Sequence, residues 1–213
     1  MGAGTFHAPN GAALTVEQAF CRVEAVARPS TDSDIRFEVW LPLEWNGRMW
    51  GVGNGNFAGQ ISYHGLATHV AEGYATVATD AGHAADSMDS TWALGHAEKV
   101  TDFGHRAVHE ATANAKRLVA TFYGRPPNRS YFGSCSDGGR EALMEAQRYP
   151  EDYDGIIAGA PAYDWTRLFI AAGLMQKWLL DESHRIPVAK LPALESAALK
   201  ACDQLDGRQG RRH

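Results

Sequence analysis

The chain has no long apolar run and no cluster of basic residues. None of its hydrophobic stretches approaches the ~18 residues that a membrane-spanning helix needs, so we expect no membrane partner. The formal net charge is -5, and the Lys and Arg residues are scattered except for three arginines near the C-terminal end. Because a nucleic-acid surface needs clustered positive charge, we also expect no nucleic-acid partner. Residues 1–6 have neither the basic start nor the apolar core of a signal peptide.

Cysteine is scarce as well. The chain has three, Cys21, Cys135 and Cys202, and this odd number cannot all pair internally. None stands in a C-x-x-C or Cys/His spacing typical of a zinc site. Cysteine usage therefore predicts no zinc and leaves the redox compartment open.

The 213 residues, 45% hydrophobic and 21% charged, are typical of a folded protein with a substantial core. Alternating or continuous apolar patterns predict strands over residues 21–27, 35–42, 48–53, 74–80, 130–132 and 155–161. Helical patterns separate the later strands, over residues 66–73, 100–123 and from 141 onward. This order with short links predicts an α/β fold, with a mostly parallel sheet covered by helices on both faces.

One short stretch, residues 130–140, combines a strand, an abrupt turn and the start of a helix. Ser136 lies at the turn, with the small residues Ser134 and Gly138 two positions to either side. A nucleophile elbow needs this layout, because its strained serine leaves no room for bulky neighbours. It would raise the serine hydroxyl above the sheet edge and aim the N–H of Asp137 at an oxyanion. Since Ser134 replaces the usual glycine, a Ser/Gly-rich turn with Ser136 as a helix cap is the alternative.

Two loops at strand ends add candidate site residues. Residues 53–59 are rich in Gly and Asn, and in an α/β-hydrolase this loop supplies the second oxyanion N–H, here from the region of Gly55 and Asn56. The alternative is a flexible turn; a phosphate loop is excluded because the Lys-Ser/Thr ending is missing. His83 follows the strand that ends at Asp80, and we consider it a candidate for lining the substrate site.

These residues resemble the tannase and feruloyl esterase family of α/β-hydrolases, which also includes a terephthalate monoester esterase. The resemblance covers roughly residues 2–207, and its most specific part is Cys-Ser-x-Gly-Gly-Arg at 135–140 followed by Glu-Ala-Gln-Arg-Tyr-Pro at 145–150. It implies hydrolysis of small aromatic-acid esters through an acyl-enzyme on Ser136, with no cofactor for catalysis. It also implies a secreted or periplasmic protein, although this chain shows no signal peptide.

The resemblance implies two further roles. Cys135 matches a cysteine that forms a structural disulfide to a cysteine beside the catalytic histidine; a small buried thiol is the alternative reading. Asp203 and Asp206 match the start of a structural calcium loop in the family's lid domain. Two solvated carboxylates at a helix end are the alternative for this pair.

The chain also departs from the family pattern. After Ser136 it has only His184 and His213, and neither stands in a stretch like the family's acid or histidine motifs. The cysteine partners and the acidic residue expected after Gly207 are missing too. We therefore interpret residues 1–162 as the N-terminal part of the catalytic domain, 163–207 as the start of a helical lid and 208–213 as a divergent tail, with a truncation or frameshift near Gly207.

This interpretation predicts little or no esterase activity for the isolated chain, because the general base and its carboxylate partner are absent. The alternative function is an inactive fragment or a non-catalytic α/β-hydrolase-like binding module. A serine peptidase or acyltransferase on the same fold would differ in lid and acceptor pocket, which the sequence does not contain.

Overall fold

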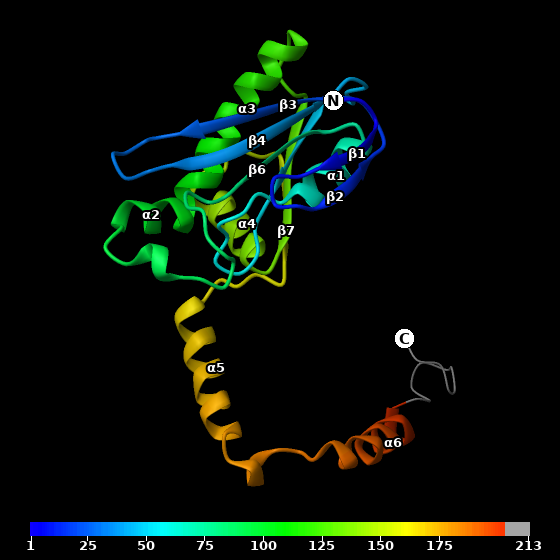
Figure 1. Ribbon diagram of the computed structural model, residues 1–213. Coiled ribbons are helices and arrows are strands. Elements are labelled where there is room, and N and C mark those ends of the chain that lie inside the picture. The colour runs from blue at the N-terminus through cyan, green and yellow to red at the C-terminus, as the bar shows by residue number, and fades with distance from the viewer. Residues whose placement is uncertain (203–213) are drawn as a thin grey trace. The chain divides into compact units, whose positions relative to one another are not determined.

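The computed structural model describes residues 1–202, which fall into two compact units (Figure 1). The first unit is Met1–Tyr163 and the second begins at Asp164, one residue from the boundary that the change in sequence pattern suggested. Within the described residues, no helix is both long and apolar enough to cross a membrane.

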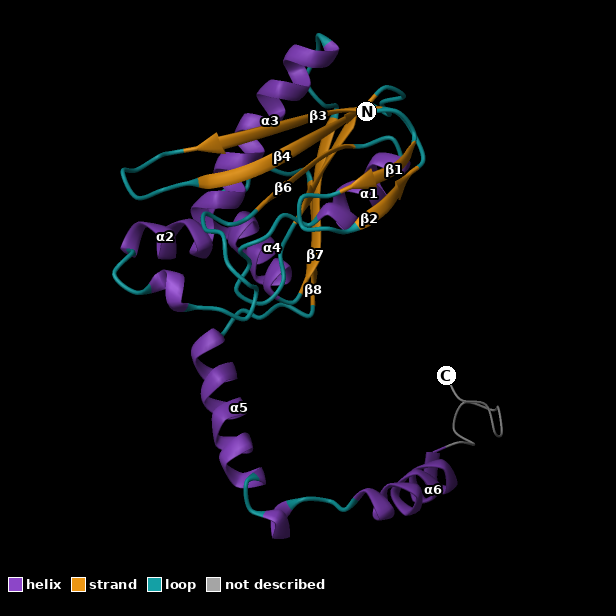
Figure 2. Ribbon diagram, in the orientation of Figure 1, coloured by secondary structure: helices purple, strands orange, loops and turns teal. Residues whose placement is uncertain are grey.

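The first unit is built on a six-stranded sheet with the order β3-β4-β6-β5-β7-β8 (Figure 2). The two β3–β4 and β4–β6 pairs are antiparallel, whereas β5 pairs parallel with β6 and β7, and β7 pairs parallel with β8. The strands are β3 (Phe20–Ala27), β4 (Ile35–Pro42), β5 (Arg48–Val52), β6 (Ala75–Thr79), β7 (Arg129–Cys135) and β8 (Gly155–Gly159). All six occur where the apolar patterns predicted strands.

Helices cover both faces of this sheet, because neighbouring residues of a strand point to opposite sides. On β4, Val39 and Leu41 pack into one core with α3 (Ala107–Tyr123) and α4 (Asp137–Arg148). Trp40, between them, packs into a second core with α1 (Tyr63–Ala71). The predicted α/β class with helices on both faces is confirmed.

Several elements differ from the prediction: α1 begins at Tyr63 and not at residue 66, and α4 begins at Asp137 and not at residue 141. A hairpin of β1 (Gly4–His7) and β2 (Ala13–Val16) was not foreseen; its Phe6 and Val16 cover the aromatic core around Trp40. Its strands are only four residues long, too short for a clear alternating pattern. The helix expected from residue 100 begins earlier, as α2 (Ala97–Thr101), and runs through a π-helical turn, Asp102–Arg106, into α3.

The second unit contains α5 (Trp165–Leu179) and α6 (Leu191–Cys202), separated by two short 3₁₀ turns. The side chain of Asp164 caps α5 by accepting a hydrogen bond from the N–H of Arg167 at 3.2 Å. Both helices lie within residues 163–207, which the sequence analysis interpreted as the start of a helical lid.

Candidate active site

Ser136 lies at the abrupt turn between β7 and α4. Its backbone angles are φ 63° and ψ −119°, a conformation that costs a non-glycine residue free energy and persists only where the surroundings hold it. The end of β8 and the chain that follows it do so: the Ser136 N–H donates to the Gly159 carbonyl, and the Ala162 N–H donates to the Ser136 carbonyl, both at 3.0 Å. Ser136 itself is exposed, so the strain presents its side chain to solvent.

Packing around the turn explains why its neighbours are small. A Cβ atom on Gly138 would lie 2.1 Å from the Ser134 Oγ, and one on Gly139 would lie 2.4 Å from the Gly159 carbonyl oxygen. No side chain fits either position. Ser134 therefore replaces the usual glycine without conflict only because Gly138 opposite it has no side chain.

Some backbone N–H groups at the start of α4 and in the glycine-rich loop have no acceptor among the described residues. Asp137 is the first residue of α4, where an N–H has no acceptor inside the helix. In the glycine-rich loop, the N–H groups of Gly55 and Asn56 have no acceptor among the described residues, and Asn56 has a positive φ of 52°. The candidate oxyanion donors are thus on the two elements that the sequence indicated.

The glycine-rich loop is attached to α4 through Asn54 and Glu141. The Asn54 N–H donates to Glu141 Oε2 at 2.8 Å, and the Asn54 Nδ2 donates to Glu141 Oε1 at 3.1 Å. In return, the Gly138 N–H donates to the Asn54 carbonyl at 2.8 Å. Gly53 is required here, because a Cβ on it would lie 2.6 Å from Glu141 Oε2.

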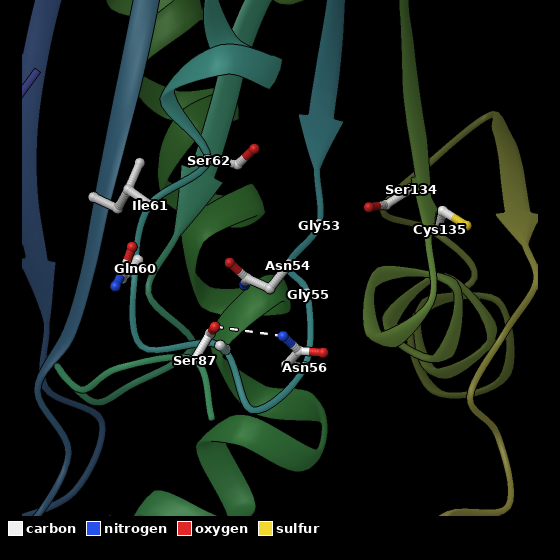
Figure 3. A pocket seen from close by; sticks show the side chains of 11 residues that line it. Gly53, Asn54, Gly55, Asn56, Gln60, Ile61, Ser62, Ser87, Ser134 and Cys135 are labelled. Atoms are coloured by element: carbon white, nitrogen blue, oxygen red, sulfur yellow. Dashed lines mark hydrogen bonds between the residues drawn. The ribbon is translucent and has the colours of Figure 1, made fainter. Parts of the chain in front are cut away.

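A cavity of about 420 Å³ lies between this loop and the end of β7 (Figure 3). The Ser134 hydroxyl points toward the loop, whereas the Cys135 sulfur points to the other side of the strand. The lining carries no charged side chain; it consists of Gly53, Asn54, Gly55, Asn56, Ala58, Gln60, Ile61, Ser62, Ser87, Ser134 and Cys135. Such a surface suits a neutral ligand with hydrogen-bonding groups.

The first turns of α4, next to Ser136, contain buried charged side chains. Asp137 is fully buried and pairs with Arg140, whose Nε donates to Asp137 Oδ1 at 2.6 Å. Arg140 also donates to the carbonyls of Phe103 and Gly104 in the π-helical turn. Burial raises the pKa of Asp137 and raises the pKa of Glu141 to about 7, in the second case with the help of the Asp137 charge. These contacts fix the first turns of α4 to the rest of the unit.

The structure does not place His83 in the lining of this cavity, and its role at the substrate site stays a prediction. His83 is only 3% exposed; its ring stacks on Trp92 with the ring centres 3.7 Å apart, and its Nε2 contacts the Phe57 carbonyl at 2.7 Å. Burial lowers the pKa of His83, and its contact with the Phe57 carbonyl attaches the ring to the glycine-rich loop.

The predicted disulfide and calcium roles stay predictions. Cys135 is exposed, and it and the other two cysteines are free thiols in this structure. Asp203 and Asp206 lie outside the described residues. Among residues 1–202, no group of three or more His, Cys, Asp and Glu side chains could hold a metal ion. His184, in the second unit, stacks on Trp178 and contacts its carbonyl.

Sequence reasoning missed Glu141, Asn54 and Arg140 as parts of the site. Each is almost fully buried although its type is usually exposed. One signal was available: Glu141 lies three residues after Gly138 and so shares its face of α4, where the elbow already demands close packing.

Comparison with known proteins gives the family. The profile described as "Tannase and feruloyl esterase" matches residues 21–210. The chain is 43% identical over 212 residues to an uncharacterized esterase of Xanthomonas campestris pv. campestris, covering 96% of the chain and 36% of the relative. It is 36% identical over 191 residues to a probable feruloyl esterase B of Aspergillus clavatus, covering 88% of the chain and again 36% of the relative.

Solved structures of an esterase and an acyl hydrolase have a similar fold. Feruloyl esterase B from Aspergillus oryzae superposes with a TM-score of 0.72 at 34% identity, over 76% of this chain and 33% of that one. Tannin acyl hydrolase from Aspergillus niger shares the fold with a TM-score of 0.75 at 24% identity, over 97% of this chain and 39% of that one. The chain thus spans about a third of the length of these relatives. With its elbow, its glycine-rich loop and these matches, it belongs to the tannase and feruloyl esterase family.

Proposed function

We propose that the protein is a serine carboxylic-ester hydrolase that acts on aromatic-acid esters and that this chain carries its nucleophile. The observation that carries the proposal is Ser136: an exposed serine held at φ 63° between a parallel strand and a helix. A strained conformation of this kind is maintained at functional sites, because the surrounding structure has to stabilise it. The family and the names of its relatives support the ester-hydrolase chemistry.

In the proposed reaction, the Ser136 hydroxyl oxygen attacks the ester carbonyl carbon and its proton passes to a general base. The carbonyl oxygen becomes an oxyanion between the N–H of Asp137 and an N–H from Gly55 or Asn56. The tetrahedral intermediate expels the alcohol, which takes up the proton, and leaves an acyl-Ser136. Water then releases the aromatic acid and restores the serine.

We place the base and its carboxylate partner outside this chain, since neither His184 nor His213 stands in a stretch like the family's histidine motif. Removing a member of such a triad leaves about 10³-fold catalysis over water, from the oxyanion donors and binding alone. We therefore expect the isolated 213-residue chain to show little esterase activity. Robust hydrolysis of a p-nitrophenyl ester by the isolated chain, lost in Ser136→Ala, would contradict this placement.

The main test uses the full-length gene product that contains this chain. Methyl gallate, methyl ferulate and a terephthalate monoester are assayed with the wild type, with Ser136→Ala and with Ser90→Ala. Ser90 is an exposed serine whose side chain makes no capping hydrogen bond to the 3₁₀ turn that follows it. We expect Ser136→Ala to lower kcat at least ~10⁴-fold on the preferred ester and Ser90→Ala to have no effect. A fluorophosphonate should label the peptide that contains Ser136. Full activity of Ser136→Ala would refute the nucleophile assignment.

The resemblance also leads us to propose a secreted or periplasmic protein with a structural calcium ion at Asp203 and Asp206. Cell fractionation tests the first point. Calcium-dependent thermal stability of the full-length gene product, lost in Asp203→Asn with Asp206→Asn, tests the second.

A further inference from the structure

A buried carboxylate connects the two elements that carry the candidate oxyanion donors. Glu141 is 2% exposed and lies on the second turn of α4. Its two oxygens accept the main-chain and the side-chain N–H groups of Asn54, at 2.8 and 3.1 Å. Two hydrogen bonds to one buried carboxyl group, one from the main chain and one from the side chain, fix residue 54 in both position and orientation.

The attachment runs in both directions. The Gly138 N–H, in the first turn of α4, donates to the Asn54 carbonyl at 2.8 Å. Asn54 is therefore tied to α4 through its N–H, its carbonyl and its side chain. Asp137, which offers the other candidate donor, begins the same helix. One rigid element thus sets the position of both donors.

The contact also decides which loop N–H is available. Since Glu141 takes the N–H of Asn54, the next amides along the loop, those of Gly55 and Asn56, are left for a ligand. Asn56 is further held by a contact of its Nδ2 with the Ser87 Oγ at 3.4 Å (Figure 3). Gly55 itself has no atom within 4 Å of a Cβ position, so nothing but the loop backbone fixes its amide.

We propose that Glu141 is a positioning residue: by holding Asn54, it keeps the loop N–H of Gly55 or Asn56 directed at the oxyanion that Asp137 also stabilises. This inference rests on the proposed esterase function. It assigns Glu141 no contact with substrate, so its loss should weaken transition-state stabilisation more than substrate binding.

The same helix provides a matched control. Glu145, one turn further along, is 0% exposed and is also a carboxyl in the interior. Neither of its oxygens has a hydrogen-bond partner among the described residues, and no contact joins it to the glycine-rich loop. Glu141→Gln and Glu145→Gln therefore make the same chemical change in one helix, and only the first disturbs Asn54.

The first experiment measures steady-state kinetics of the full-length gene product with its preferred ester. Removing an oxyanion donor typically costs 10²–10³-fold in kcat, and a misplaced donor should cost about 30-fold. We expect this loss in kcat for Glu141→Gln, with KM changed less than about 3-fold, and less than about 2-fold change in either constant for Glu145→Gln. A boronic acid that mimics the tetrahedral intermediate should lose affinity for Glu141→Gln by the same factor as kcat.

A second variant, Asn54→Ala, changes the other partner of the same contact. It keeps the inference testable if Glu141→Gln does not fold. It removes only the Nδ2 bond and should lower kcat by about 5-fold. Unchanged kcat in a folded Glu141→Gln or in Asn54→Ala would overturn the proposal. Equal losses in Glu141→Gln and Glu145→Gln would do so as well, because they would show a general effect on the helix.

Amide hydrogen exchange gives a readout that does not depend on activity. The Asn54 amide should exchange at least ~10-fold faster in Glu141→Gln than in Glu145→Gln, whereas exchange in β4 stays the same. Unchanged exchange at Asn54 would also overturn the positioning role. If the exchange result holds but Ser136→Ala keeps full activity, the proposed function fails and the loop attachment stands as a structural fact.

Discussion

The two ends of helix α4 hold the same side chain under opposite conditions. Glu141, near the start, accepts two hydrogen bonds from Asn54, whereas Glu145, near the end, has no donor among the described residues. Burial raises the pKa of both carboxyls, to about 7 for Glu141 and to about 9 for Glu145, where the nearby Asp152 adds to the shift. A buried carboxyl is thus kept partly charged only where the structure supplies donors.

This difference separates a functional end of the helix from a structural one. The first turn carries the strained Ser136, the paired Asp137 and Arg140, and the attachment to the glycine-rich loop. The last turn faces Asp152, which contacts His109 through Oδ2 at 2.6 Å. At the first end, the strained backbone and its hydrogen bonds position the candidate site. At the second end, the protonation of Glu145 affects the stability of the fold.

The largest effect on stability is expected from adding a methyl group at the first end. Gly138→Ala would place a Cβ 2.4 Å from the Ser134 Cβ and 2.9 Å from the Asn54 carbonyl oxygen. Overpacking of this kind should lower the free energy of unfolding by about 3 kcal/mol, although alanine favours helices. The measurement is urea unfolding of the purified chain. At the other end, the exposed Ala146→Gly should cost only about 1 kcal/mol; a Gly138→Ala loss no larger than that would refute the steric argument.

A smaller effect is expected from the pH dependence of stability. Because the pKa of Glu145 is raised from 4.5 to about 9, the folded state binds a proton that the unfolded chain releases between these values. The free energy of unfolding must therefore fall as the pH rises through this window, by at most about 1.4 kcal/mol per pH unit for one group.

Between pH 7.5 and 9 the decline should come mainly from Glu145, because the pKa of Glu141 is about 7, although the Glu141 charge helps to raise the pKa of Glu145. Glu145→Gln should flatten the decline of stability in that range, and Glu141→Gln should flatten it less. An equal flattening by both variants would show that the two ends do not differ in protonation.

The smallest effect is expected at His109, at the structural end. His109→Phe keeps a ring that can stack on Tyr149, now at 3.9 Å, but removes the contact with Asp152. Because the imidazole is one-third exposed, the pair should contribute only about 0.5 kcal/mol to stability. Thermal unfolding of His109→Phe and of Asp152→Asn at neutral pH measures this contribution. A loss of stability above about 2 kcal/mol would contradict the prediction that this contact is minor.

The elbow could be predicted from the sequence because its requirements are local. A strained serine demands small residues two positions away, and Ser134 and Gly138 meet that demand within the printed sequence. The parallel strands were equally visible, since a strand buried on both faces is apolar throughout.

The Glu141 contact could not be predicted in the same way. Its partner Asn54 lies 87 positions away, and a glutamate in a helix is usually exposed. His83 illustrates the same limit: its place after a strand suggested a site residue, and the structure adds a stack on Trp92 that helps to bury it. No local sequence pattern indicates that Asn54 contacts Glu141 or that Trp92 stacks on His83.

The sequence by itself determined most of the elements, the α/β class, the family resemblance and the identity of the serine at the turn, because backbone preference and apolar patterning act over a few residues. Only the tertiary structure decided which buried charges have partners and which loop amides remain free. That depends on where α4 and the loop after β5 meet, and their meeting is fixed by the packing of the whole sheet.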